Sequence, residues 1–371
     1  MFNKLFDMLR ISKNRRVRTV IKSFFITVAS VAIIVGIGVA IWNRTVAPPV
    51  IVLPTGPIAV PPTNIAPPPD RNTENNNGGS DIDEPTPVYV WPFPERMADD
   101  RRDLFYTFLI IGLNEGTNVN TAMVASYCAA SREANLISIP RDVPVHATRN
   151  GRKLASSYII GAGGGRGIAG GVAQVQHDIL NVIGFIPDFY VVFDYDAFFA
   201  IIDAIGGIEV YVPFHMRYTD PYQNLDINIL PGLQRMDSET ALHFARFRRA
   251  NRGYQSITDF QRIRNQQAVI NAVINELLRP SNILQVPTFV NIFNDSVHTN
   301  LTTPNMMFFA LELNNIMGTD DFHTYTFPTH TSGEPMWYEL LTPNSVLELV
   351  NRTINPFYQY IELRDINIVR E

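Results

Sequence analysis

The stretch Leu136-Ile137-Ser138-Ile139-Pro140-Arg141-Asp142 joins an apolar run to a charged pair, and the fold can be worked out from it in both directions. The apolar run predicts a buried strand over 135–139, and comparable runs predict strands over 105–113, 121–128, 190–193 and 208–213. Apolar residues at steps of three and four predict helices over 170–183 and 196–205. Because strands alternate with helices, we expect an α/β domain in which helices cover both faces of a central sheet.

Four arginines mark a candidate binding site: Arg141 in the opening stretch, Arg246 and Arg248 in Arg246-Phe247-Arg248, and Arg262 near the start of a helix. An alternating Arg-x-Arg on a strand or tight turn points both guanidinium groups to one side. A guanidinium is always charged and binds phosphate in a fork. The chain of 371 residues has a net charge of −5, so these cations are not part of a general basic surface. We therefore expect a local site for a ligand with several phosphates.

The helix that carries Arg262 is predicted to start at Ser256-Ile257-Thr258-Asp259, which has the Ser-x-x-acid spacing of a capped N-terminus, and to run to about Leu278. Arg262 and Gln266 are four residues apart and share one face, and Asp259 is close enough to hold the guanidinium. The positive N-terminus of the helix adds to the attraction for an anion. Spacing alone equally allows Arg262 to be a solvated surface residue paired with Asp259.

The N-terminal region has the features of a membrane anchor. Residues 24–42 contain no charge and would form about 28 Å of helix, close to the ~30 Å core of a bilayer. Seven Lys or Arg residues precede or border this run and only Arg44 follows closely, so residues 1–22 are expected to be a basic cytoplasmic tail. We expect a transmembrane helix over 23–42 and an external C-terminal domain. A cleaved signal peptide is the alternative, although its apolar region would be shorter.

Residues 43–98 are expected to be an external linker. The segment 48–94 holds half of the 26 prolines and includes Asn75-Asn76-Asn77-Gly78-Gly79, a composition that buries too little apolar surface to fold. Residues 99–280 are then the predicted α/β domain. Residues 281–371, with predicted helices over 304–317 and 345–350 and a strand over 322–327, are expected to be a C-terminal extension packed on that domain. The single cysteine, Cys128, excludes an intrachain disulfide.

Motifs for several other chemistries are missing from the sequence or weak. It contains no Walker A motif, no HExxH, no Cys/His zinc spacing and no Gly-x-Ser-x-Gly elbow. A Gly-x-Gly-x-x-Gly pattern through Gly165, Gly167 and Gly170 lacks the acidic partner about 20 residues on that a dinucleotide site needs. His243 is expected to pack within a helix, and Asp196 to cap one.

Taken together, the apolar and charged segments resemble the LytR-CpsA-Psr family of cell-wall phosphotransferases over about Phe105 to Leu278. The motifs occur in the family's order and near its spacing, and they are specific in combination. They are Phe108-Leu109-Ile110-Ile111-Gly112, Leu136-Ile137-Ser138-Ile139-Pro140-Arg141-Asp142, Ile186-Pro187-Asp188-Phe189-Tyr190, Asp203-Ala204-Ile205-Gly206-Gly207-Ile208-Glu209-Val210, Ala241-Leu242-His243-Phe244-Ala245-Arg246-Phe247-Arg248 and Asp259-Phe260-Gln261-Arg262-Ile263-Arg264-Asn265-Gln266-Gln267.

This resemblance implies a membrane-anchored external enzyme of a Gram-positive-type bacterium. Such an enzyme moves a glycopolymer, for example teichoic acid or capsule, from an undecaprenyl-pyrophosphate carrier onto peptidoglycan. The resemblance also implies Mg²⁺ as cofactor and a lipid chain in an apolar tunnel. Segments around 189–199 and 270–278 are candidates for the tunnel wall, with ordinary core packing as the alternative.

The resemblance also assigns roles to individual residues. The expected catalytic residues are Arg141, Asp142 and Asp259, as guanidinium clamps and the carboxylates that orient them. The residues expected to bind the pyrophosphate are Arg141, Arg246, Arg248, Arg262, Gln266 and, from a looser match, Lys153.

Two positions depart from the family's pattern. Asn120 and Asn114 stand where the family has the aspartates that are its expected magnesium ligands. Asparagine keeps the shape and loses the charge, whereas Mg²⁺ prefers carboxylate oxygen. A unit charge pair at 4 Å is worth roughly 4 kcal/mol at an effective dielectric of 20, so metal binding is expected to weaken. Glu115, Asp142 or Asp259 are candidates to compensate.

These substitutions leave two functions open. The first is the glycopolymer phosphotransferase. The second is a catalytically weakened protein of the same fold that binds a polyprenyl pyrophosphate or regulates a related transferase. A nucleic-acid binder is disfavoured, because the net charge of −5 gives no broad basic surface.

Overall fold

The computed structural model describes residues 48–51, 100–114, 117–146, 152–223, 225–277, 279, 282, 285–316, 322–333 and 337–369. The predicted membrane helix over 23–42 and most of the predicted linker lie outside these residues. Within the described ranges, no helix combines the length and the apolar character needed to cross a membrane.

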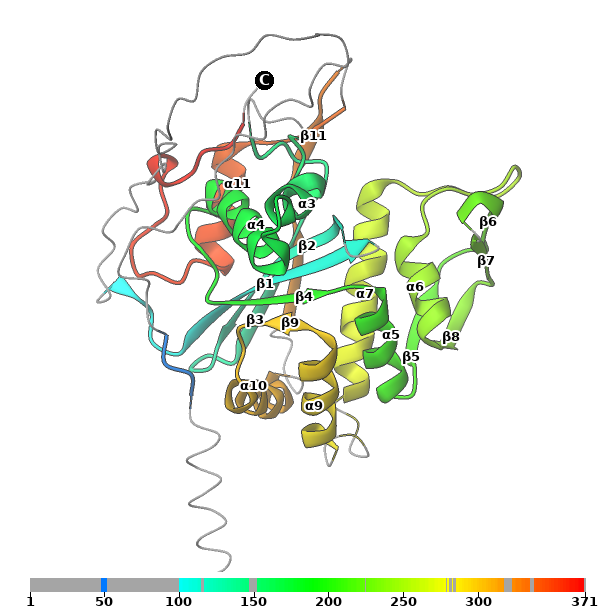
Figure 1. The fold of residues 1–371 in the computed structure, drawn as a ribbon, viewed down its shortest axis with the longest axis horizontal. Helices are drawn as coiled ribbons and strands as arrows, with labels where there is room; N and C mark the ends of the chain where they lie inside the picture. Colours follow the sequence, from blue (N-terminus) through cyan, green and yellow to red (C-terminus); the bar gives the residue numbers. More distant parts are fainter. Residues whose placement is uncertain are drawn as a thin grey trace, which may run out of the picture. The chain divides into compact units, whose positions relative to one another are not determined.

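The centre of the domain is a mixed six-stranded sheet in the order β10-β3-β2-β1-β4-β9 (Figure 1). β1 pairs antiparallel with β2 and parallel with β4, while β3 pairs antiparallel with β2 and parallel with β10. The strands are β1 (Phe105–Asn114), β2 (Asn118–Cys128), β3 (Glu133–Ile139), β4 (Phe189–Phe193), β9 (His298–Thr299) and β10 (Phe322–Thr326).

The first half of the chain places its strands at the centre of this sheet because their residues are apolar on both faces. β1 and β4 are also joined at their starts by Asp188. Its carboxylate accepts hydrogen bonds from the backbone N–H and the hydroxyl of Thr107, at 2.8 and 2.7 Å, and pairs with Arg101. The motif Ile186-Pro187-Asp188 therefore has a structural role in fixing the parallel pair.

Helices cover both faces of the sheet, as the sequence predicts (Figure 1). One face packs against α4 (Gly167–Ile183) and α11 (Pro343–Thr353) in a continuous apolar core. The predicted stripe of α4 is buried there, including Val172, Val175 and Ile179. The other face is covered by α5 (Tyr195–Ala204), α7 (Asp259–Leu277), α9 (Val286–Ser296) and α10 (Thr303–Ile316).

The segment after residue 281 is built into the sheet. β9 and β10 form its two edges, and α9, α10 and α11 cover both faces. The predicted helices over 304–317 and 345–350 and the predicted strand over 322–327 correspond to α10, α11 and β10. A small ribbon of β11 (Thr329–Thr331) and β12 (Glu339–Leu341) follows β10.

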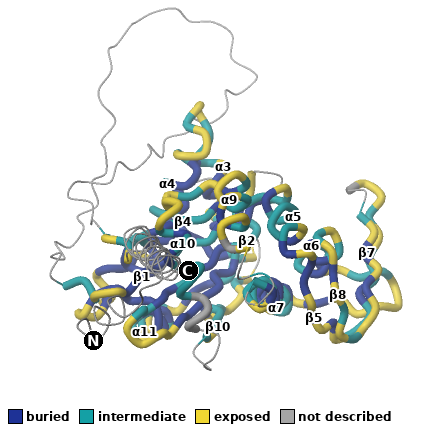
Figure 2. The backbone as a smooth tube through the Cα atoms, turned by 90° about the horizontal axis from the view of Figure 1, so that it is seen from below, coloured by how far each residue is buried: buried dark blue, intermediate teal, exposed yellow. Residues whose placement is uncertain are grey.

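A smaller lobe extends from the sheet and has an apolar core of its own. Figure 2 shows buried residues in two places, along the central sheet and around β5 and β8. The lobe consists of two antiparallel ribbons and one helix: β5 (Ile208–Val212), β6 (Met216–Asp220), β7 (Leu225–Ile229), β8 (Gly232–Met236) and α6 (Ser238–Arg246). α7 contributes Val269 and Ala272 to this core, so it connects the lobe with the sheet.

The glycine-rich segment forms the crossing between two helices. α3 (Ser157–Ala162) packs directly on α4, and a Cβ on Gly161 would lie 2.3 Å from the carbonyl oxygen of Gly170. No side chain can replace either glycine without separating the helices. This close contact accounts for Gly161 and Gly170, while Gly165 and Gly167 adopt positive φ angles of 81° and 57° around the start of α4.

Candidate functional site

Two of the four predicted arginines, Arg248 and Arg262, meet at Asp259, the first residue of α7, and Arg141 lies close by. Its Oδ1 atom is 2.9 Å from Nη2 of Arg262 and 3.7 Å from Nε of Arg248. Arg141, which follows β3, is near enough for its charge to act on Arg262, as do the charges of Arg248 and Asp142. Residues from β3, from the segment after α6 and from α7 therefore converge on one place.

Arg262 lies at the buried centre of this group. It is 5% exposed, and its Nε atom is buried without a hydrogen-bond partner among the described residues. Burial lowers the pKa of Arg262 to about 10, Asp259 opposes this shift, and Arg141 and Arg248 add to it. At neutral pH the guanidinium is still a full cation with an unused donor. The prediction that Asp259 holds Arg262 is confirmed, and the surface alternative for Arg262 is wrong.

The start of α7 fixes this geometry through a capping box that begins two residues after the predicted one. Thr258 Oγ1 accepts a hydrogen bond from the N–H of Gln261 at 3.2 Å, and the Gln261 side chain accepts one from the N–H of Thr258 at 2.9 Å. Ser256, the predicted cap, instead accepts a hydrogen bond from the N–H of Ala250. The expectation was wrong because Thr-x-x-Gln overlaps Ser-x-x-Asp in this sequence and satisfies the same rule.

Two further contacts hold α7 and the arginines in place. Gln267 donates hydrogen bonds to the Ser138 hydroxyl and to the Tyr325 carbonyl, both at 2.9 Å, which anchors α7 on β3 and β10. Phe247, between Arg246 and Arg248, is fully buried and packs against Phe214 with ring centroids 6.1 Å apart. Burial of this ring fixes the backbone between the two arginines.

Arg246, the last residue of α6, joins the site through an aromatic ring. Its guanidinium lies 5.0 Å from the ring centroid of Tyr195, whose hydroxyl donates a hydrogen bond to Oδ1 of Asn114 at 3.2 Å. A cation over an aromatic face is attracted by the ring quadrupole. The sequence analysis did not include Tyr195, and it wrongly expected Asp196 to cap α5. Asp194 is the cap, and accepts a hydrogen bond from the N–H of Ala197.

Arg141 is held by Asn120. Its Nη1 atom donates a hydrogen bond to Oδ1 of Asn120 at 2.5 Å. Gly112 pairs with Thr121 and Leu113 pairs with Val119, which leaves Asn120 as an additional residue between them in β2. Such a β-bulge re-aims a side chain and is common beside functional sites. The register of the β1–β2 hairpin was not readable from the sequence.

The remaining predicted residues lie around the arginines. Asp142 Oδ1 is 2.7 Å from Nζ of Lys153, and its Oδ2 is 4.0 Å from Nε of Arg141. Gln266 is buried on the next turn of α7 after Arg262, 9% exposed. The predicted residues comprise five cationic side chains and two carboxylates, so the group keeps an excess of positive charge that suits a diphosphate.

The oxygen donors at this place do not fit Mg²⁺. Asn120 Oδ1 accepts from a guanidinium, and Asn114 Oδ1 accepts from a phenol. Asp142 and Asp259 are each paired with cations. In the described part of the chain, no three His, Cys, Asp or Glu side chains gather as a metal ion would need. Glu115, the other candidate, lies outside the described residues.

An apolar cavity of about 420 Å³ lies between the sheet and the helices of its second face. This volume is in the range of ligand-binding pockets. The predicted segment 270–278 contributes Ile270, Ile274 and Leu277 to the wall, whereas the wall residues of α5 come just after the predicted segment 189–199. α9 and α10, which the sequence analysis did not connect with the cavity, supply Phe293 and Phe309.

The same elements carry both the charged group and the cavity wall. β1 has Asn114 at its end and Ile110 in the wall, and α7 has Arg262 in its first turn and Ile270 in the wall. Eight residues of helix span about 12 Å, at 1.5 Å per residue. β2 and α5 repeat this arrangement, with Asn120 and Tyr195 at one end of each element. The cations are therefore placed at one end of an apolar cavity.

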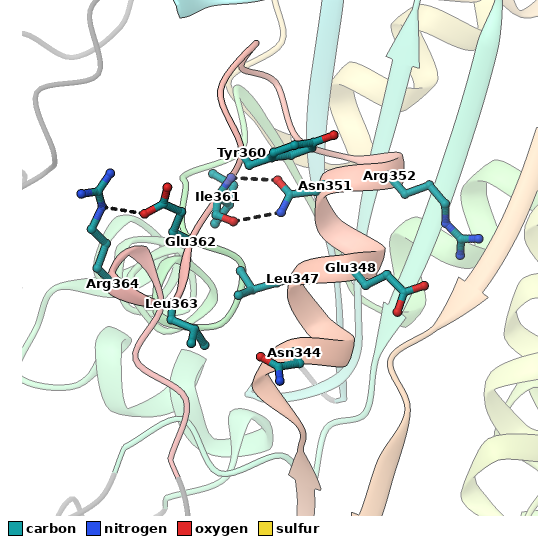
Figure 3. A pocket seen from close by; sticks show the side chains of 10 residues that line it. All are labelled: Asn344, Leu347, Glu348, Asn351, Arg352, Tyr360, Ile361, Glu362, Leu363 and Arg364. Carbon is teal, nitrogen blue, oxygen red and sulfur yellow. Dashed lines mark hydrogen bonds and ion pairs between the residues drawn. The ribbon is translucent and has the colours of Figure 1, made fainter.

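A second, open hollow of about 960 Å³ lies between α11 and the C-terminal segment (Figure 3). Its polar groups hold that segment in place. Asn351 accepts a hydrogen bond from the N–H of Ile361 and donates one to its carbonyl, and Glu362 pairs with Arg364. None of the predicted phosphate-binding residues lines it.

Comparison with known proteins identifies the family and several relatives of this chain. A family model described as LytR_cpsA_psr family matches residues 97–353. Regulatory protein MsrR of Staphylococcus aureus (strain COL) is 24% identical over 252 residues, which cover 67% of this chain and 71% of that protein. The polyisoprenyl-teichoic acid–peptidoglycan teichoic acid transferase TagV of Bacillus subtilis (strain 168) is 28% identical over 188 residues, 49% of this chain and 44% of that protein.

Solved structures show the same fold. The crystal structure of B. subtilis TagV superposes with a TM-score of 0.56 at 19% identity, covering 68% of this chain and 96% of that one. A structure of TagT bound to LI-WTA superposes with a TM-score of 0.53 at 15% identity, covering 69% and 91%.

Proposed function

The chain belongs to the LytR-CpsA-Psr family, and we propose that its α/β domain binds a polyprenyl diphosphate that carries a glycopolymer and transfers the glycopolymer to peptidoglycan. The diphosphate lies among the arginines and the prenyl chain enters the apolar cavity. Residues 23–42 anchor the protein in the cell membrane with this domain outside, so that the lipid carrier is within reach.

The observation that carries the proposal is the position of the cations relative to the cavity. A polyprenyl diphosphate is a doubly ionised head on a long apolar chain, and the fold presents a charged group at one end of an apolar cavity of about 420 Å³. Neither feature alone would select this ligand class. A nucleotide would need polar groups where Ile110, Ile270 and Phe309 lie, and a fatty acid would not need several guanidinium groups.

The residues have separate roles in the proposed transfer. Arg262 and Arg141 bind the diphosphate oxygens, and Asp259 and Asp142 keep these guanidinium groups oriented. In the transfer, the acceptor hydroxyl oxygen forms a bond to the phosphorus that carries the glycopolymer, and the bond from that phosphorus to the bridging oxygen breaks. The hydroxyl proton is released to solvent, and negative charge grows on the departing prenyl phosphate. Preorganised guanidinium groups stabilise this charge, because phosphoryl transfer depends more on positioning and electrostatics than on covalent help.

A second function is favoured by Asn114 and Asn120. The chain then holds the lipid carrier, or regulates a related transferase, without turnover. Release of a labelled glycan phosphate from its lipid diphosphate separates the two functions. Turnover by the natural chain supports the transferase, whereas turnover gained only in an Asn120→Asp variant supports the binding protein.

Binding of polyprenyl diphosphate to the full chain in detergent tests the ligand class itself. We expect the double variant Arg141→Ala/Arg246→Ala to lose binding by at least about 100-fold, since each charge-assisted contact is worth about 1.5–3 kcal/mol. Arg264→Ala is the matched control, because Arg264 is on α7 two residues from Arg262 and exposed. Unchanged affinity in the double variant would refute the assignment.

A further inference from the structure

The charged end of the cavity points to a phosphate site that does not use a divalent cation. We infer that this chain binds its polyprenyl diphosphate through guanidinium groups alone, so that Mg²⁺ contributes little to the affinity. This inference rests on the proposed function and concerns how the same site neutralises its ligand.

The amide oxygens of Asn114 and Asn120 already accept hydrogen bonds. Arg141 donates to Oδ1 of Asn120 at 2.5 Å, and Tyr195 donates to Oδ1 of Asn114 at 3.2 Å. An amide oxygen is a weaker ligand for Mg²⁺ than a carboxylate. A metal ion at Asn120 would also have to displace a guanidinium that repels it.

Both carboxylates of the site already have cationic partners. Asp142 pairs with Lys153 at 2.7 Å, and Asp259 pairs with Arg262 at 2.9 Å and with Arg248 at 3.7 Å. Each carboxylate is therefore neutralised within the site. A dication added here would face guanidinium groups on several sides, and the two carboxylates of the site are already paired.

The cationic side chains of the site can supply the positive charge that a metal would supply. Four arginines and Lys153 outnumber the two carboxylates, which leaves an excess of positive charge for the diphosphate. Arg262 is 5% exposed and its buried Nε atom has no hydrogen-bond acceptor among the described residues. A phosphate oxygen bound at Arg262 would satisfy this donor, and guanidinium groups bind phosphate in a bidentate manner.

The experiment measures binding of geranylgeranyl diphosphate to the full chain in detergent by calorimetry, once with excess EDTA and once with excess Mg²⁺. We expect a dissociation constant that changes by no more than about twofold between the two conditions, because no site carboxylate is open to the metal. A titration of Mg²⁺ into geranylgeranyl diphosphate in the same detergent without protein corrects for complexes that Mg²⁺ forms with the ligand in solution.

A matched pair of variants sharpens the test. Asn114→Asp/Asn120→Asp restores two carboxylates, and we expect Mg²⁺ to raise its affinity by about tenfold or more, because hard carboxylate oxygens are then present. Asn367→Asp adds a charge at an exposed position of the C-terminal segment and should respond as the natural chain does.

The outcomes separate this inference from the function on which it rests. Binding by the natural chain in EDTA, with a Mg²⁺ response only in the double variant, supports it. Binding by the natural chain only when Mg²⁺ is present overturns it and leaves the proposed function intact. A Mg²⁺ response of about tenfold or more in the natural chain, as in the double variant, also overturns it. Failure to bind under either condition overturns the proposed function as well.

Discussion

The two faces of the central sheet come from the same strands and are filled in opposite ways. Toward α4 and α11, Leu109 and Ile111 are 0% exposed in a continuous core. Toward α5, α7, α9 and α10, the alternating residues Phe108 and Ile110 are half-buried and border the cavity. β1 thus contributes residues of the same apolar type to the packed face and to the face that borders the cavity, here called the hollow face.

This difference separates stability from binding within one sheet. Close-packed atoms on the α4 face gain dispersion and burial energy from every side. Residues that line a void lack partner atoms on one side and contribute less. The α4 face should therefore stabilise the fold, while the cavity face is free to accept a chain of variable shape. Substitutions on the two faces should therefore differ in their effects on stability and on binding.

The largest expected effect is on stability, from neighbouring residues of β1. Leu109→Ala should lower the free energy of unfolding by about 2–5 kcal/mol, since it opens a new void in a packed core. Ile110→Ala should cost less than about 2 kcal/mol, because its side chain already borders empty space. Urea unfolding of both variants, with equal slopes, measures the difference.

Ile110→Ala should in addition weaken binding of a polyprenyl diphosphate, and Leu109→Ala should not while the chain remains folded. If both variants lost the same stability, the contrast between a packed and a hollow face would be wrong.

A smaller effect, on binding alone, should follow from filling the cavity. Ala204 of α5 lines the wall, and Ala204→Phe places a ring in the space assigned to the prenyl chain. We expect about a tenfold or greater loss of affinity for geranylgeranyl diphosphate, because buried methylene contacts of about 0.8 kcal/mol each are excluded. Calorimetry with inorganic pyrophosphate should show no change, since the arginines are untouched.

Asp203→Phe is the control for this substitution, because it adds the same ring at an exposed position of the same helical turn. Equal losses of affinity in the two variants would show that any added ring disturbs α5. The cavity would then not be the binding site of the prenyl chain.

The sequence allowed most of the fold to be predicted but not the difference between the faces. Strands and helices follow from apolar periodicity, and β1, β3, α4 and α10 lie within a few residues of their predicted ranges. The sequence of β1 shows that the residues on both faces of the strand are apolar. It does not show whether other side chains fill the space next to each face. That depends on how α9 and α10 pack over the sheet, through contacts between residues far apart in the chain.

The residues of the candidate site could likewise be predicted from the sequence only in part. The arginines could be chosen from the sequence because charged residues next to apolar strands are conspicuous. Tyr195, which links Arg246 to Asn114, has no such signal, since a tyrosine at the start of a helix is ordinary. The bulge at Asn120 depends on the register between β1 and β2, which one sequence does not specify.

The smallest effect should come from the cap of α7, which covers the hollow face. A helix beside a cavity gains less from packing, so local contacts should matter more for its first turn. Thr258→Ala removes the Oγ1 acceptor of the Gln261 N–H and should cost about 1 kcal/mol of unfolding free energy. Because the same turn holds Arg262 against Asp259, hydrogen exchange should rise at the start of α7, and diphosphate affinity should fall slightly. Thr258→Ser keeps the hydroxyl acceptor, so its unfolding free energy and its diphosphate affinity should match those of the natural chain. If Thr258→Ser lost as much unfolding free energy as Thr258→Ala, the loss would come from packing of the methyl group and not from the cap.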